Sequence, residues 1–267
     1  RVTTFRADVS DESQVEAFRD AVAKDHGTDH LNLLFNNAGI GGGGSMITDE
    51  RSTWERTFGV DWGGVYLCTR AFLPMLVAAE EGHLVNTSSL NGLFASIGPT
   101  TPHTAYSAAK FAVRGFSEAL IADFRVNAPH VHVSVVMPGH IGTSIVLNSA
   151  KAHGNSADDM DEEDLDRFRK QLNRQGIPAD GLSDEDLRKG VQMMGEHFRD
   201  NAPTSADEAA KIILDGVRAN RWRILVGHDA EVIDAEVRAD PEHAYDVDFW
   251  DGMRGRGLFG LFGAAGE

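Results

Sequence analysis

The sequence predicts an α/β fold, a doubly wound parallel sheet with helices on both faces. Three observations predict it. Short segments rich in Val, Leu and Ile alternate along the chain with segments whose apolar residues recur at helical spacing. The apolar segments are nearly continuous, which is typical of strands buried on both faces. Polar or glycine-rich residues follow several of them, at the edge where such sheets bind ligands.

The first part of the chain already contains this alternation. Two segments predict strands and two predict helices, the second of them interrupted by a cluster of glycines. In order, these are strand 2–9, helix 11–27, strand 31–39 and helix 49–82 with its interruption at 59–64.

The alternation continues to residue 227. Strand-like and helical segments follow one another as strand 83–89, helix 105–126, strand 131–139, helix 206–220 and strand 221–227. Ser205 and Glu208 have the spacing of a capping box at the start of the helix 206–220.

Residues 148–203 differ from the rest of the chain because they are polar and acidic. Two stretches within them place apolar residues on one helical face, around Leu165 and around Leu187. We therefore expect a single domain over residues 1–267, with residues 148–203 inserted as a helical lid over the substrate. We call residues 148–203 the lid segment. Its apolar inner faces favour an apolar substrate.

Composition excludes several classes of function. The formal net charge is −16, from 41 acidic and 25 basic residues, so the surface repels nucleic acid and anionic membranes. No apolar stretch is long enough to span a bilayer. The single Cys68 rules out an intrachain disulfide and a cysteine zinc cluster, and the acidic run 158–164 lacks the glycine of a calcium loop. We expect a soluble, cytoplasmic protein without a metal.

The run NNAGIGGGG (36–44) formally matches the dinucleotide fingerprint G-x-G-x-x-G at Gly39, Gly41 and Gly44. The fingerprint also requires an acidic residue at the end of the next strand, about 20 residues further on. Asp61 has roughly that spacing but lies in a helical region. We therefore interpret the match as a decoy and not as a phosphate loop.

The sharpest chemical signal is YSAAK, with Tyr106 and Lys110 four residues apart on one helical face. A free tyrosine has a pKa of about 10, and a neighbouring ammonium favours its phenolate. Ser88 and Ser89 end one predicted strand, and MPGHIGTS follows the next. These strand ends and the Tyr/Lys helix are expected to meet in one crevice.

Taken together, these motifs make the chain resemble a classical short-chain dehydrogenase/reductase, with a Rossmann-like fold. The resemblance covers roughly residues 1–147, and residues 221–227 fit the family's last strand. It implies hydride transfer between NAD or NADP and a secondary alcohol or ketone. The motifs that carry it are Asp8-Val9, Asn36-Asn37-Ala38-Gly39, Ser89 with Gly92, Tyr106-x-x-x-Lys110, and Pro138-Gly139 with Thr143.

The resemblance also implies roles for individual residues. Tyr106 is expected as the general acid/base, Lys110 as its activator and as a ligand of the nicotinamide ribose, and Ser89 as the residue that orients the substrate oxygen. Asp8 and Val9 are expected near the adenine, and Ile141 and Thr143 near the carboxamide. Further cofactor contacts are expected from Asn36, Ala38, Gly39, Pro138 and Gly139.

Three departures from the family pattern stand out. The usual glycine-rich loop is absent before Asp8, so the chain is expected to be an N-terminally truncated fragment without its first strand–helix units. Asp61 occupies a position where the family usually has asparagine. Our hypothesis is that this carboxylate stabilises Lys110, opposes the Tyr106 phenolate and moves activity to higher pH. Tyr106 follows Ser89 by seventeen positions, a few more than is common, which leaves Ser88 as a substitute for Ser89.

Two other functions stay open at this point. A truncated member acting only as a binding or interaction protein is one; the intact Ser89, Tyr106 and Lys110 oppose it. Lyase or epimerase chemistry is the other; its relatives carry an acidic residue near the tyrosine, and PHTAYSAAK has none. The family also implies a homodimer or homotetramer, formed through long helices such as 105–126.

Overall fold

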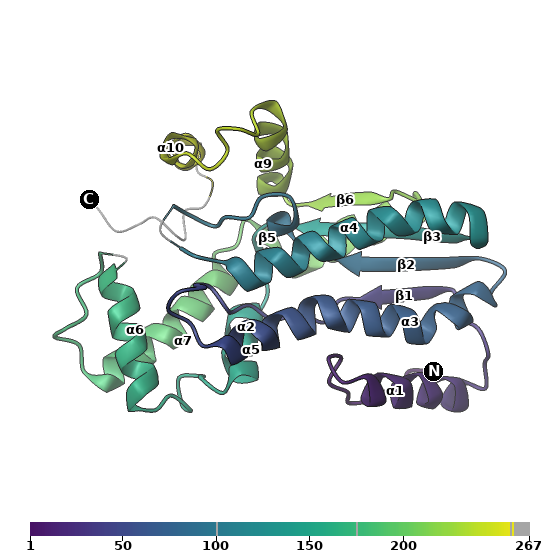
Figure 1. Cartoon of the computed structure of the whole chain (residues 1–267), viewed down its shortest axis with the longest axis horizontal. Helices are drawn as coiled ribbons and strands as arrows, with labels where there is room; N and C mark the ends of the chain where they lie inside the picture. The colour runs from purple at the N-terminus through teal and green to yellow at the C-terminus, as the bar shows by residue number, and fades with distance from the viewer. Residues whose placement is uncertain (100, 175, 257, 259–267) are drawn as a thin grey trace.

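Four parallel strands form the central sheet of the computed structural model, which describes residues 1–99, 101–174, 176–256 and 258 (Figure 1). The strand order is β1–β2–β3–β6. Each strand pairs in parallel with the next, as in Val85 opposite Ser134. The strands span Leu33–Asn36 (β1), Gly82–Thr87 (β2), Val131–Pro138 (β3) and Arg223–Val226 (β6).

Helices cover both faces of this sheet, which confirms the doubly wound prediction. Helices α3 (Gly64–Val77) and α4 (Thr104–Asn127) lie side by side across one face (Figure 1). There Leu76 and Leu120 pack with Leu84 and Val133 of the sheet. Helix α8 (Ala206–Arg218) covers the opposite face, where its apolar residues form a second cluster with Val85, Val136 and Ile224.

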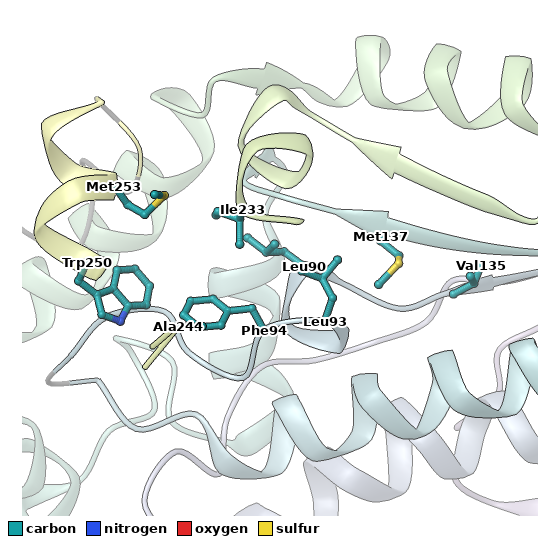
Figure 2. Packing of buried hydrophobic residues seen from close by; sticks show 9 residues of the cluster. All are labelled: Leu90, Leu93, Phe94, Val135, Met137, Ile233, Ala244, Trp250 and Met253. Atoms are coloured by element: carbon teal, nitrogen blue, oxygen red, sulfur yellow. The ribbon is translucent and has the colours of Figure 1, made fainter. Parts of the chain in front are cut away.

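A third cluster joins the segment after β2 to the last described helices, α9 (His228–Ala239) and α10 (Val247–Gly255). Figure 2 shows Phe94 between Trp250 and Leu93, with Ile233 of α9 above them. The sequence analysis did not predict α9 or α10. The rest of the Phe/Gly-rich tail, residues 257 and 259–267, lies outside the described residues.

The predicted helix 49–82 is present, and its interruption is a change of pitch. Helix α2 (Arg51–Phe58) continues into a π-helical turn, η1 (Gly59–Gly63), and then directly into α3. Such turns insert one extra residue into the helical repeat and often mark functional sites. Helix α1 (Glu12–His26) also matches its prediction, with Asp11 as N-cap and Gly27 as left-handed C-cap.

The predicted strand at residues 2–9 is wrong, because these residues form no strand. A strand requires a neighbouring backbone to bond to, and this segment pairs with no strand of the described chain. Its contacts are with side chains, such as that of Thr3 with His26 and that of the Asp8 amide with Gln14.

The two predicted helices of the lid segment are α6 (Glu162–Arg174) and α7 (Asp184–Asp200). A further helix, α5 (Ile145–His153), precedes them and was not expected; the short strands β4 (Ile141–Gly142) and β5 (Thr204–Ser205) pair on either side of the insertion. The insertion has its own apolar cluster: Met160, Leu165, Leu172, Ala179 and Leu187. Helix α7 begins with a full capping box, whereas Ser205 caps α8 by accepting the Glu208 N–H.

Candidate active site

The carboxyl ends of β1, β2 and β3 open on one side of the sheet, towards α5, α6 and α7 (Figure 1). Asn36, Thr87 and Pro138 are the last residues of these strands. The segments that follow them are the three that the sequence singled out. Parallel strands therefore bring all three motifs to one edge, as expected.

Tyr106 and Lys110 lie in the first two turns of α4, beside that edge. The Lys110 side chain is 4% exposed, and its Nζ lies 5.2 Å from the centre of the Tyr106 ring. Nζ donates to the Thr87 carbonyl oxygen, 3.3 Å away at the end of β2. The predicted pairing of the phenol with a buried ammonium is therefore present in the fold.

Asp61 completes this buried group from the π-helical turn η1. Its Oδ1 accepts the Ile40 N–H at 2.8 Å, and its Oδ2 lies 3.8 Å from Lys110 Nζ. Oδ2 has no hydrogen-bond partner, although the side chain is 0% exposed. Burial raises the pKa of the Asp61 carboxyl, and Lys110 and the Ile40 hydrogen bond oppose the rise.

Ser88 and Ser89 differ in what they bind. The Ser88 hydroxyl donates to the Lys110 carbonyl oxygen at 2.7 Å, so it holds α4 against the end of β2. Ser89 Oγ accepts the Asn91 N–H at 3.1 Å and caps the short turn η2 (Leu90–Gly92). The Ser89 hydroxyl keeps its own proton to donate, whereas that of Ser88 is committed. This difference favours Ser89 as the candidate for the substrate oxygen.

His103 comes just before the predicted helix 105–126, where the sequence alone favours a loop histidine exposed to water. Its ring instead packs on the Tyr106 ring, with 4.7 Å between centroids. Burial lowers the pKa of His103 to about 4, so the imidazole is neutral at pH 7. The only available signal was its position one turn before the tyrosine.

The glycine run 39–44 is used for close packing. Gly39 touches the Asp61–Lys110 pair, because a Cβ there would lie 3.1 Å from Asp61 Oδ1 and 3.2 Å from Lys110 Nζ. The Gly43 and Gly44 carbonyls accept the N–H groups of Ala105 and Thr104, which begin α4. The run therefore packs against the start of the helix that carries Tyr106.

Asp8 and Val9 lie beside the π-helical turn η1, where Asp8 contacts Arg56 of α2 and Val9 contacts Gly64 of α3. Asp8 Oδ2 forms an ion pair with Arg56 of α2 at 2.8 Å, and its Oδ1 accepts two bonds from Ser10. Burial acts to raise the pKa of Asp8, but the Ser10 bonds and Arg56 outweigh it, and the pKa is lowered. Val9 packs where a Cβ on Gly64 would clash.

Asn36 is buried and turned into the core. Its amide donates to Thr69 Oγ1 and to Asn86 Oδ1, both at 2.9 Å, which ties β1 to α3 and β2. Asn37 and Ala38 are exposed beyond it, and the Asn37 amide oxygen accepts the Thr87 hydroxyl proton. Within the NNAG motif, Gly39 is therefore the residue whose backbone packs next to Lys110.

The loop after β3 is held by a residue that the sequence did not indicate. Asp229, in the first turn of α9, lies so close to Gly139 that any Cβ there would overlap its carboxylate. Its Oδ2 accepts the His140 N–H at 2.6 Å. Ile141 then pairs with Thr204, and Thr143 follows β4, half-exposed.

Comparisons with known proteins show the family of the chain. A family model described as short chain dehydrogenase matches residues 1–154, more than half of the chain. The chain belongs to the short-chain dehydrogenase family. The putative oxidoreductase SadH of Mycobacterium tuberculosis is 36% identical over 238 residues, 89% of this chain and 72% of SadH. The uncharacterized oxidoreductase YxbG of Bacillus subtilis is 29% identical over 180 residues, 66% of this chain and 62% of YxbG.

Solved structures give the same result for this short-chain dehydrogenase. A Burkholderia phymatum member in complex with NAD has a TM-score of 0.63 and 27% identity, covering 91% of this chain and 75% of that one. A Burkholderia cenocepacia member in complex with NADP has a TM-score of 0.61 and 20% identity, covering 91% and 78%, a likeness of fold. The cofactor of the family is NAD or NADP.

The insertion of this short-chain dehydrogenase reaches the site through α5. Gly41 donates its N–H to Ser149 Oγ at 2.7 Å, and its carbonyl oxygen lies 2.8 Å from His153 Nε2. At the other end of the insertion, His140 Nε2 lies 2.7 Å from the Phe198 carbonyl oxygen of α7. The lid segment therefore contacts the loops after β1 and β3, at the carboxyl edge of the sheet.

A cavity of about 710 Å³ lies on the side of α4 next to Tyr106. His103 and Phe111 line it, together with Tyr245 from the segment before α10, but Tyr106 and Lys110 do not. In the described part of the chain, no helix combines the length and apolar character needed to cross a membrane, and no three His, Cys, Asp or Glu side chains are grouped for a metal.

Proposed function

We propose that this protein is an NAD- or NADP-dependent oxidoreductase that interconverts a secondary alcohol and a ketone, with Tyr106 as the general acid/base. The observation that carries the proposal is the buried Lys110 ammonium, 5.2 Å from the Tyr106 ring at the carboxyl edge of the sheet. A phenol beside a buried cation is suited to exchanging a proton with a substrate oxygen. Family membership supplies the reaction class.

The chain's own residues divide the work as follows. Tyr106 donates its proton to the oxygen of a ketone or removes one from an alcohol. Lys110, held by the Thr87 carbonyl, stabilises the phenolate that forms in between. Ser89 donates its hydroxyl proton to the same substrate oxygen, and Ser88 keeps α4 in position through the Lys110 carbonyl.

The residues at the edge fit a nicotinamide dinucleotide. Gly39 and Gly139 have no side chain to project from the loops after β1 and β3, and their backbones pack closely on the Asp61–Lys110 pair and on Asp229. Tyr106, Lys110, Ile141 and Thr143 would hold the nicotinamide half. Asp8 and Val9, with the turn 36–39 and Pro138, would line the adenosine half. When bound, the cofactor supplies or accepts the hydride.

The substrate is proposed to be apolar. The lid segment presents exposed Met193 and Met194 on α7, and α5 presents Val146. Thioether side chains adapt to apolar ligands of different shapes. The lid segment would close over such a ligand, because it is bonded to the loops after β1 and β3 at the carboxyl edge of the sheet.

A homo-oligomer is proposed on the outer faces of α3 and α4. Tyr66 and Val77 on α3 are 43% and 41% exposed, and Phe111 on α4 is 39% exposed. Apolar residues grouped on adjacent helices are typical of subunit interfaces. Light scattering on the purified chain tests this, and a monomer at micromolar concentration would contradict it.

The decisive experiment is Tyr106→Phe against Tyr66→Phe, each assayed with NADH and NADPH on a panel of apolar ketones. Both variants lose one phenol oxygen, but only Tyr106 adjoins Lys110. We expect Tyr106→Phe to lower kcat by about 10²–10⁴-fold and Tyr66→Phe to leave it unchanged. Equal activities would remove Tyr106 from the mechanism.

Cofactor binding is tested separately, by energy transfer from the four tryptophans to NADH or NADPH. Saturable binding with no turnover of any ketone or alcohol would favour the alternative of a binding protein. Binding of neither cofactor to the folded chain would contradict the assignment of the cofactor residues in this chain.

A further inference from the structure

The carboxylate of Asp61 supplies something that an amide at this position would not. Its Oδ1 accepts the Ile40 N–H, a bond that an asparagine oxygen would accept equally well. Its Oδ2 has no hydrogen-bond partner and lies 3.8 Å from Lys110 Nζ. The difference between the two side chains at this site is therefore a negative charge placed against Lys110.

Few other charges act on this group. From α4 it faces Lys110, with Tyr106 behind, and from α5 it faces His153, which also acts to lower the Asp61 pKa. His153 Nε2 already bonds the Gly41 carbonyl. His103 packs on Tyr106 but is neutral at pH 7, because burial lowers its pKa to about 4. Lys110 is thus the main countercharge for both acids.

One buried ammonium therefore lies between two acids. Its Nζ is 3.8 Å from Asp61 Oδ2 and 5.2 Å from the centre of the Tyr106 ring. When Asp61 is ionised, it neutralises Lys110, and a Tyr106 phenolate would then add an uncompensated charge to a partly buried site. Partial burial disfavours that charge. The two acids consequently compete for one cation, and their ionisations are coupled.

We propose that the Asp61 carboxylate keeps Tyr106 protonated at neutral pH by neutralising Lys110, so that the site is set to donate a proton to a carbonyl oxygen, the reductive direction. This inference rests on the proposed function. In that direction the Tyr106 O–H bond breaks and an O–H bond forms on the substrate oxygen. The hydride comes from the reduced nicotinamide. Solvent later returns a proton to the Tyr106 phenolate. Asp61 acts through Lys110 and is a positioning residue.

The charge of Asp61 is expected to change the pH at which Tyr106 ionises, and not the ratio of the reductive and oxidative rates at a given pH. At any one pH the ratio of kcat/KM in the two directions is set by the reaction's equilibrium. A tyrosine that stays protonated longer extends the reductive plateau to higher pH and delays the rise of oxidation by the same amount. An Asp61→Asn variant should move both limbs to lower pH together.

The primary test does not require turnover. The ultraviolet absorbance of phenolate is titrated in the unmodified chain and in Asp61→Asn, each with and without Tyr106→Phe, so that subtraction isolates Tyr106 from Tyr66 and Tyr245. We expect the Tyr106 midpoint to fall by about one pH unit in Asp61→Asn. Asp123→Asn, an exposed carboxylate on α4, controls for the change in net charge and should not move it.

Coincident midpoints in the unmodified chain and Asp61→Asn would overturn the inference, because Asp61 would then be an uncharged equivalent of asparagine. Asp61→Ser, which also removes the charge, replaces Asp61→Asn if that variant does not fold. Where turnover is measurable, the reductive and oxidative pH profiles should shift with the absorbance. A shifted midpoint without turnover would instead contradict the proposed function and leave this inference standing.

Discussion

The crevice and the lid segment hold their charged groups in opposite ways. In the crevice, the side chains of Lys110 and Asp61 are 4% and 0% exposed. In the lid segment, the Lys189–Glu185 pair is 63% and 76% exposed, and the Lys170–Asp166 pair is 63% and 50% exposed. One charge pair is thus buried in the protein, whereas the others are exposed to water.

This difference in burial means that the crevice positions its charged groups precisely, whereas the lid segment tolerates changes to its own. Exposed pairs between adjacent helical turns contribute little to stability and keep the helices in solution. A buried pair fixes the position of both groups, and removing either leaves an unpaired charge. The lid segment also has its own apolar cluster around Leu165 and Leu187. Because this cluster is separate from the crevice, substitutions in the lid segment should leave the packing of the crevice unchanged.

The largest expected effect comes from breaking the buried pair. Lys110→Met leaves Asp61 without a countercharge and should lower the free energy of unfolding by about 3 kcal/mol. It should also abolish oxidoreductase activity. The matched change in the lid segment is Lys189→Met, which removes an exposed pair and should leave the urea midpoint unchanged. Similar losses in the two variants would erase the contrast between the regions.

Replacing a glycine by alanine should lower the free energy of unfolding in the crevice and raise it in the lid segment. A Cβ on Gly92 would overlap Ser88 Oγ and lie 2.7 Å from the Lys110 carbonyl oxygen, so Gly92→Ala should cost about 1–3 kcal/mol. Gly190, inside α7, has one contact at 3.9 Å, from Phe168. Gly190→Ala should therefore stabilise by about 0.5–1 kcal/mol. Denaturant unfolding measures both changes. A Gly92→Ala variant more stable than the unmodified chain would contradict the prediction and would mean that the loop after β2 moves to accommodate the Cβ.

Acid should affect the sheet before it affects the lid segment. His83 of β2 lies 2.8 Å from Ser134 Oγ, and burial, with His132 nearby, lowers its pKa to about 4. The unfolded histidine binds a proton near pH 6.5, so the stabilisation present above that pH is lost as pH falls towards 4. The Tm should fall by a few degrees between pH 7 and 5.

His83→Gln should lose less Tm than the unmodified chain over that pH interval. His30→Gln, which changes an exposed histidine, should behave like the unmodified chain. Equal acid sensitivity of all three proteins would show that His83 is not the group responsible.

The smallest expected effect is at the anchor of the lid segment. Ser149→Ala removes the acceptor of the Gly41 N–H and should cost about 1 kcal/mol, felt locally in α5. Amide exchange in residues 145–153 should then quicken roughly fivefold, with little change in Tm. Ser156→Ala, which removes an exposed bond to Asp159, serves as the control. Unchanged exchange in α5 would mean that His153 alone holds the anchor.

Much of the fold followed from local patterns in the sequence. Helices α1, α4 and α8 and strands β2, β3 and β6 lie where periodicity and apolar runs predicted them. The failures share a cause. Residues 2–9 have the composition of a strand, but strand formation depends on a partner elsewhere in the chain. Helices α5, α9 and α10 are short and are stabilised by contacts that their own sequences do not contain.

The contacts of the candidate site likewise fall into those that local spacing predicts and those that depend on tertiary packing. The sequence by itself determined that Tyr106 and Lys110 share one face of α4, because the i, i+4 spacing is a property of the helix. The family resemblance already suggested that Asp61 acts on Lys110. Tertiary structure alone decided that Ser88 and not Ser89 bonds the α4 backbone, that His103 packs on Tyr106 and that Asp229 holds the loop after β3. These contacts join residues far apart in the chain or depend on the path of a loop. No local spacing encodes them, and they arise only when the helices pack against the sheet.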